Sequence, residues 1–252
     1  MAGDTLNEPA GPAGRPSGAE VASALIREWF PDCLAAFLSG SVVRGDATAT
    51  SDLDMVIIVD SEEAPYRDSR VFNGWPVELF VHTVRSCRDY FSSDVVRGMP
   101  TLPVMCIEAV VLKDVGGLAG RIQEEARALV DEGPVLLTSE EMHSQRYFLT
   151  DLLEDFKGSL DEAETLIIAA ALATAAADLV LSHHRRWRGK GKWALRALER
   201  AEPGFAAELR AALSGFRSCG AKEPLITFTE RVLELAGGRL FEGYRVAGRR
   251  PR

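Results

Sequence analysis

Cysteine is scarce in this sequence of 252 residues, and none of its cysteines forms a C-x-x-C pair. The four are Cys33, Cys87, Cys106 and Cys219. Their scatter excludes a disulfide framework and a thiolate zinc site, and it predicts reduced, mostly buried thiols in a cytoplasmic protein. Positively charged residues are fewer than negatively charged ones: the chain has 29 Lys and Arg but 37 Asp and Glu, which gives a formal net charge of −8. Extended nucleic acid needs a basic surface, so this composition argues against it as a partner.

A long hydrophobic run is missing from the start of the chain. Residues 1–18 are rich in Ala, Gly and Pro, which predicts a disordered lead-in and no signal peptide. The most apolar stretch, 166–181, contains Asp178 and many alanines, so we expect a buried helix of a bundle and no membrane span. The remaining composition is ordinary for a globular protein, and the length suits one large domain or two small ones.

One stretch carries the chemistry of the chain. Gly40-Ser41 is followed, after about ten residues, by Ser51-Asp52-Leu53-Asp54 and the apolar run Met55–Val59, which predicts a buried strand. Residues i and i+2 of a strand point to one face, so Asp52 and Asp54 would repel each other without a cation between them. Their oxygen ligands suit Mg²⁺. The Gly-Ser turn predicts a concavity for phosphate, and both features together are the minimal apparatus for nucleotidyl transfer.

This combination resembles the signature of the polymerase-β-like nucleotidyltransferase superfamily. Gly-Ser-x-x-Arg-Gly followed by Ser-Asp-Leu-Asp looks most like the antibiotic (aminoglycoside or lincosamide) nucleotidyltransferases and their uncharacterised bacterial relatives. The resemblance implies a site that uses two Mg²⁺ ions and takes ATP or another nucleoside triphosphate. It also implies that four residues of the stretch contact the nucleotide: Gly40, Ser41, Arg44 and Ser51.

Glu78 interrupts an otherwise apolar strand over residues 77–82. An acidic residue inside a strand needs a reason, because an unpaired buried charge is costly. In the resembling superfamily a third carboxylate lies on a strand beside the Asp-x-Asp strand, which implies that Glu78 is a metal ligand and a candidate general base. The simpler alternative is an edge-strand residue that points to solvent.

Residues 19–133 are predicted to form the nucleotidyltransferase domain, with strands and helices alternating in an α/β or α+β arrangement. We expect a polar loop over 61–69, a hairpin turn at Asn73-Gly74, and a loop marked by Pro100 and Pro103. The other elements expected are helices over 19–30, 85–97 and 117–130, one or two helical turns after Ser41, and strands over 33–38, 55–59, 77–81 and 105–112.

Residues 134–247 are predicted to form a helical bundle, so the whole chain reads as α+β, with a mixed sheet followed by helices. Ser139 is the expected N-cap of the first helix. Residues 248–252 form a basic tail. The five expected helices cover residues 139–157, 161–187, 192–202, 204–216 and 223–235. We expect the active site in a cleft between the two domains.

Two groups of polar residues in the helical half suggest ligand contacts. Asp151 and Asp155 lie one turn apart and share a helix face; a solvated face is the simpler interpretation. The resemblance implies that such acids bind a cationic acceptor. The basic segment 183–193 ends a helix, where cations are favoured by the helix dipole. The resemblance implies that Lys190 or Lys192 contacts the nucleotide phosphates.

The predicted reaction transfers AMP from ATP to a hydroxyl of a small-molecule acceptor, such as an aminoglycoside-like antibiotic, and releases pyrophosphate. An acidic chain suits a cationic acceptor without selecting it. Two alternatives stand beside this reaction: protein AMPylation of the antitoxin type, and a nucleotide-binding module that has lost catalysis. Whether the protein forms a homodimer is left open.

Overall fold

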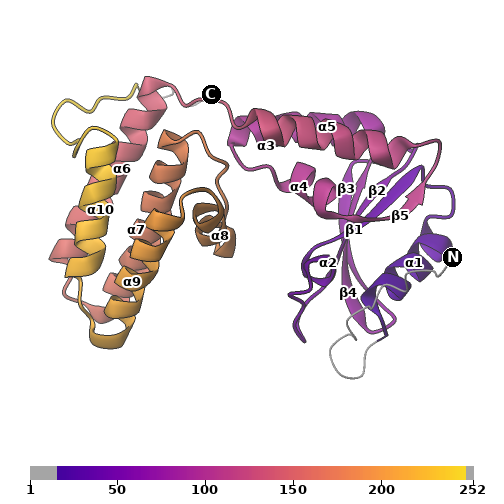
Figure 1. Cartoon of the computed structure of the whole chain (residues 1–252), viewed down its shortest axis with the longest axis horizontal. Helices are drawn as coiled ribbons and strands as arrows, with labels where there is room; N and C mark the ends of the chain where they lie inside the picture. The colour runs from indigo at the N-terminus through magenta and orange to yellow at the C-terminus, as the bar shows by residue number, and fades with distance from the viewer. Residues whose placement is uncertain (1–15, 248–252) are drawn as a thin grey trace, which may run out of the picture. The chain divides into compact units, whose positions relative to one another are not determined.

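The computed structural model describes residues 16–247, which fall into two compact units with a boundary between Glu132 and Gly133 (Figure 1). The predicted disordered lead-in lies outside the described residues as far as residue 15, and so does the predicted basic tail over 248–252. Gly18, the last residue of that lead-in, already begins a helix. Each unit has a hydrophobic core of its own.

Unit 1 is built on a mixed sheet of five strands in the order β3-β4-β2-β1-β5. β2 runs parallel to β4, whereas the pairs β1–β2, β1–β5 and β3–β4 are antiparallel. The strands are β1 (Ala35–Ser39), β2 (Leu53–Ile58), β3 (Tyr66–Phe72), β4 (Trp75–His82) and β5 (Val110–Asp114). The helices are α1 (Gly18–Trp29), α2 (Ser41–Arg44), α3 (Val84–Arg97), α4 (Thr101–Glu108) and α5 (Leu118–Glu132).

The central strand β2 is apolar because helices cover both faces of the sheet. Met55 and Ile57 pack in the core that contains α1, while Val56 and Ile58 pack in the core that contains α3, α4 and α5. Burial on both faces explains why the apolar residues of β2 are consecutive and do not alternate with polar residues. The side chains of β2 are therefore fixed by packing on either side, which gives a rigid base to the residues at its beginning.

The predicted loop over 61–69 is wrong from Tyr66 onward, because β3 begins there and pairs with β4. β3 is an edge strand with mostly exposed polar side chains, so it lacks the apolar pattern of a buried strand. The hairpin turn is confirmed. Asn73 and Gly74 have φ values of +46° and +81°, as a two-residue turn of type I′ requires.

The predicted loop at Pro100 and Pro103 and the predicted strand over 105–112 are also wrong in part. Residues 101–108 form α4, and the strand begins only at Val110. Proline is compatible with the start of a helix, because the first amides of a helix have no intrahelical acceptor. The buried Asp94 carboxylate accepts a hydrogen bond from the amide of Leu102 at 2.8 Å, which satisfies one of these amides.

Unit 2 contains five helices among its described residues, which confirms the predicted helical architecture. They are α6 (Ser139–Gly158), α7 (Glu162–His183), α8 (Lys192–Ala201), α9 (Pro203–Cys219) and α10 (Glu223–Leu235). Two details differ. Thr138 caps α6, in a capping box with Glu141, in place of Ser139. α7 ends at His183 and not at Trp187, because Arg185 adopts a left-handed conformation with φ +52°.

Helix α7 is the one helix of the described chain that is long and apolar enough to cross a membrane, and half of its apolar window is buried inside unit 2. Leu172, Ala176 and Val180 lie in the core together with residues of α6 and α10. This packing is that of a central bundle helix.

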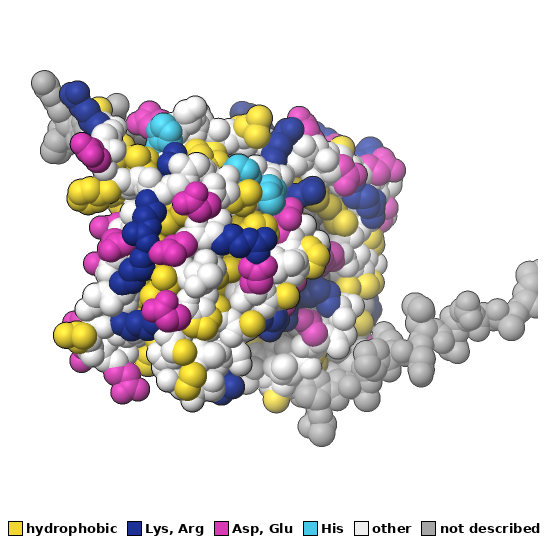
Figure 2. All heavy atoms as spheres, turned by 60° about the vertical axis from the view of Figure 1, so that its left-hand side comes forward, with side chains coloured by type: hydrophobic (Ala, Val, Ile, Leu, Met, Phe, Trp, Pro, Cys, Tyr) yellow, Lys and Arg dark blue, Asp and Glu magenta, His cyan; other side chains and the backbone are white. Residues whose placement is uncertain are grey.

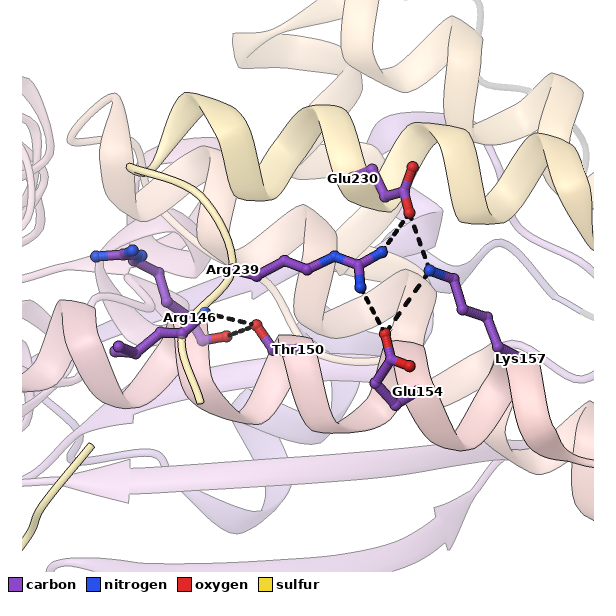
Figure 3. Close-up of polar contacts among 7 residues, drawn as sticks. Arg146, Thr150, Glu154, Lys157, Glu230 and Arg239 are labelled. Atoms are coloured by element: carbon purple, nitrogen blue, oxygen red, sulfur yellow. Dashed lines mark hydrogen bonds and ion pairs between the residues drawn. The ribbon is translucent and has the colours of Figure 1, made fainter. Parts of the chain in front are cut away.

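The chain after α10 returns along α6 and is held there by polar contacts (Figure 3). Arg146 donates to the carbonyls of Gly237 and Gly238, and the amide of Leu240 donates to Thr150 Oγ1 at 3.1 Å. Arg239 pairs with both Glu154 and Glu230. Figure 2, which brings the left-hand side of Figure 1 forward, shows basic and acidic side chains interspersed over the side of the molecule that it displays. Exposed pairs of this kind contribute little singly, so their role is to fix the path of the segment.

Asp178 on α7 is an acid placed inside the bundle. Its Oδ1 is buried and has no hydrogen-bond partner among the described residues. Burial raises the pKa of Asp178 to about 6. The folded state therefore disfavours the ionised form. The protonated carboxyl is tolerated in the core, so its contribution to stability is fully present at pH values below the unfolded pKa. This contribution is lost as the pH rises through about 6 and the carboxylate ionises.

We predict that Asp178→Asn raises the free energy of unfolding at pH 7.5 by about 1–2 kcal/mol, because it removes this buried charge. The gain should disappear near pH 4. Urea unfolding at both pH values measures it, with the exposed Asp155→Asn of α6 as the control that should change little. An equal effect at both pH values would contradict the assignment.

Candidate active site

Three carboxylates come together beside the start of β2 and the middle of β4. Asp54 on β2 and Glu78 on β4 are register partners, so their side chains project from the same face of the sheet. Asp52 lies two residues before Asp54. One oxygen from each carboxylate lies within 4.8 Å of the others, and all three residues are partly buried. The structure thus brings the predicted carboxylates into one cluster.

Gly40 makes room for this cluster. It lies between β1 and α2 with φ +83°, a conformation that L side chains rarely adopt. A Cβ atom at this position would lie 2.3 Å from Asp54 Oδ2. The Gly-Ser turn and the carboxylates are therefore in direct contact, and glycine is required here both by its backbone conformation and by space.

Ser41 opens the short helix α2, whose first amides, like those of any helix, have no intrahelical acceptor. They are the groups that an anion can use next to the carboxylates. Ser51 closes the following loop, because its Oγ accepts a hydrogen bond from the amide of Thr48 at 2.8 Å. Contact of Ser41 and Ser51 with a nucleotide stays a prediction.

Arg44, the last residue of α2, is tied to α4. Its Nη1 donates to Glu108 Oε2 at 3.3 Å, and its Nε lies 3.6 Å from Asp46 Oδ1. Its positive charge also acts on the cluster, where it lowers the pKa of Asp54. The predicted triphosphate contact of Arg44 stays a prediction.

The electrostatics of the cluster are centred on Asp54. Burial is the largest cause, and the nearby charges of Asp52 and Glu78 add to it, so that the pKa of Asp54 rises to about 6. Arg44 and Arg67 oppose this rise. A set of three crowded carboxylate oxygen donors fits a hard divalent cation such as Mg²⁺, which would relieve the repulsion.

Arg67 on β3 belongs to this site and was missed by the sequence reasoning, which placed it in a loop. Its Nη2 donates to Glu78 Oε2 at 2.5 Å, and its guanidinium lies 4.8 Å from the centre of the Phe80 ring. A signal was present: pairing residues outward from the Asn73-Gly74 turn places Arg67 opposite Phe80.

Ser39 is a second residue that the sequence reasoning missed. It pairs with Asp54 across β1 and β2, is 1% exposed, and its Oγ has no hydrogen-bond partner among the described residues. Ser39, Asp54 and Glu78 therefore form a polar row across three neighbouring strands. On the face of β2 that carries Val56 and Ile58, this row ends the apolar packing, whereas Leu53 and Val77 remain buried in the core on the opposite face.

The candidate residues of the helical half lie in unit 2. Asp151 and Asp155 are exposed on α6. Lys190 and Lys192 are exposed on either side of Gly191, which has φ +58° at the start of α8. Their proximity to the carboxylates of unit 1 stays a prediction.

Residues 25–90 match the model of the nucleotidyltransferase domain family. The matched segment contains the Gly-Ser turn and all three carboxylates. The chain therefore contains a nucleotidyltransferase domain of the polymerase-β-like superfamily, as the motif predicts. No curated protein matches the chain. Among solved structures, a nucleotidyltransferase-like protein from Exiguobacterium sibiricum 255-15 is 9% identical, with a TM-score of 0.45, over 87% of this chain and 76% of that one.

Gly40→Ala tests the contact between the turn and the carboxylates. We predict a loss of about 2–4 kcal/mol in stability, since the new Cβ adds a clash with Asp54 to the strain of a positive φ. Gly45→Ala is the matched control: its φ is +75° and nothing lies within 4 Å of its Cβ, so it should lose only about 1 kcal/mol. Thermal unfolding compares the two, and equal losses would refute the contact.

Asp54→Asn tests the electrostatic account. Because the folded-state pKa is raised, the ionised carboxylate lowers stability above the unfolded pKa, fully so above about pH 6. We predict that the variant gains about 1–2 kcal/mol at pH 7.5 in metal-free buffer and nothing near pH 4. Mn²⁺ should raise the unfolding temperature of the wild type and not of the variant. A variant that is less stable than wild type at pH 7.5 would contradict this account.

Proposed function

We propose that this nucleotidyltransferase moves AMP from ATP to a hydroxyl of a small-molecule acceptor, such as an aminoglycoside-like antibiotic, and releases pyrophosphate. The observation that carries the proposal is the contact between the Gly40 turn and the cluster of Asp52, Asp54 and Glu78. Nucleotidyl transfer needs a place for phosphates directly beside carboxylates that hold cations. Both are present within one short segment of unit 1.

Each residue then has a role that its position supports. Asp52, Asp54 and Glu78 would hold two Mg²⁺ ions. When bound, such ions neutralise the triphosphate and make the acceptor hydroxyl more acidic. The turn of Gly40 and Ser41 would bind the phosphates. Glu78 lies on the flank of the cluster away from this turn, which suits a base that takes the proton of the hydroxyl.

The residues predicted to bind ligands in unit 2 have side chains that suit these roles. Lys190 and Lys192 are exposed cations at the start of a helix, available for phosphate oxygens. Asp151 and Asp155 are exposed acids that suit a cationic acceptor. The net charge of −8 favours the approach of such an acceptor. A binding module without catalysis would have no need for three crowded carboxylates, which cost stability when no cation is bound.

We predict Mg²⁺-dependent release of pyrophosphate from ATP in the presence of one member of a panel of aminoglycosides and lincosamides. Asp54→Ala and Glu78→Gln should each lower the rate by about a thousandfold, since metal-held charge stabilises the transition state by several kcal/mol. Asp68→Ala, an acid on β3 that pairs with Arg70 outside the cluster, should keep the wild-type rate.

The outcomes separate the candidates. If ATP binds in a Mg²⁺-dependent way but no pyrophosphate is released with any of the drugs, the search moves to protein acceptors, as in AMPylating enzymes. Turnover retained in a folded Asp54→Ala variant would refute the metal assignment. A wild-type protein that does not bind ATP would refute the proposed reaction as a whole.

A further inference from the structure

Glu78 interacts with two different sets of charged groups. As a member of the carboxylate cluster it faces Asp52 and Asp54. On its other side, Arg67 Nη2 lies 2.5 Å from its Oε2, a short charge-assisted hydrogen bond. Among the ion pairs of the described residues, the pair of Arg67 with Glu78 is the one that brings a cation into direct contact with the cluster.

The strand order places Arg67 and the Gly-Ser turn on opposite flanks of the cluster. Across the sheet, Gly40 follows β1, Asp54 lies on β2, Glu78 on β4 and Arg67 on β3. In an in-line transfer the leaving pyrophosphate and the attacking hydroxyl lie on opposite sides of the phosphorus. If phosphates occupy the flank of Gly40, Arg67 lies on the flank from which the acceptor approaches.

A divalent ion and the guanidinium compete for the same charge. Both would lie within a few ångströms of Glu78, where two cations repel each other. Arg67 can move, because its side chain is 58% exposed on an edge strand and rests on the face of Phe80. Its displacement costs little more than one partly exposed ion pair.

We propose that Arg67 is the resident counter-ion of the acidic site. In the metal-free protein it holds Glu78 in place, and it gives way when a divalent ion binds. Arg67 is thus a positioning residue that sets the metal concentration at which the site fills, and its release leaves a guanidinium on the acceptor flank. The inference rests on the proposed metal-dependent function.

Mn²⁺ binding to the full chain, followed by the electron paramagnetic resonance signal of free Mn²⁺, tests this proposal. Arg67→Ala should bind Mn²⁺ about fivefold more tightly than wild type, since a partly exposed ion pair no longer competes. Arg67→Lys, which keeps the charge, should stay near the wild-type affinity. Arg70→Ala is the matched control: this arginine lies on the same strand, is 61% exposed, and pairs with Asp68 outside the cluster.

A merely structural role of Arg67 predicts the opposite change, weaker Mn²⁺ binding in Arg67→Ala because Glu78 loses its support. Weaker or unchanged binding in a variant that unfolds at the temperature of Arg70→Ala would overturn the proposal. In the Glu78→Gln background, removal of Arg67 should no longer tighten binding, and tightening there would also overturn it. If neither wild type nor Arg67→Ala binds Mn²⁺, the proposed metal-dependent function itself fails.

Discussion

The mutual repulsion of three carboxylates is the constraint on which unit 1 depends. One oxygen of each carboxylate lies within 4.8 Å of the others because of the backbone and not because of mutual attraction: Asp54 pairs with Glu78 across β2 and β4, and Asp52 immediately precedes β2. Such crowding persists only where the surrounding structure is rigid enough to impose it. β2 provides that rigidity, because its residues beyond Asp54 are packed on both faces. The packed core of the sheet therefore holds the three carboxylates together in an arrangement that a cation would stabilise.

Two arginines partly neutralise the negative charge of the cluster from opposite sides. Arg44 acts from α2 and is itself held by Glu108 of α4, whereas Arg67 acts from β3 and contacts Glu78 directly. Both lower the pKa of Asp54, but burial and the two neighbouring carboxylates outweigh them. The site is thus only partly neutralised by its own residues. A site of this kind retains affinity for a further cation, which is the property that metal-dependent chemistry requires.

The sequence drew attention to all three carboxylates, which the structure brings together, because each has a local signal. The two aspartates stand at the start of an apolar run, so strand periodicity predicted their shared face. Glu78 stood out because it interrupts another apolar run after an Asn-Gly turn, and its place beside the aspartates was implied by the family resemblance. Arg67 escaped because its strand is an edge strand whose polar side chains carry no hydrophobic pattern. α4 escaped because two prolines at its start suggest a loop, although proline is tolerated in a first turn. Ser39 escaped because a buried serine without a partner has no sequence signature.

The position of Arg67 also limits how an acceptor can present itself. A guanidinium on the acceptor flank repels an ammonium group there and attracts an oxyanion. In the proposed reaction, a cationic acceptor would therefore offer a hydroxyl whose neighbouring amines point away from β3. The charges of unit 1 therefore favour an acceptor whose groups beside the reacting hydroxyl are neutral or anionic on the side of β3.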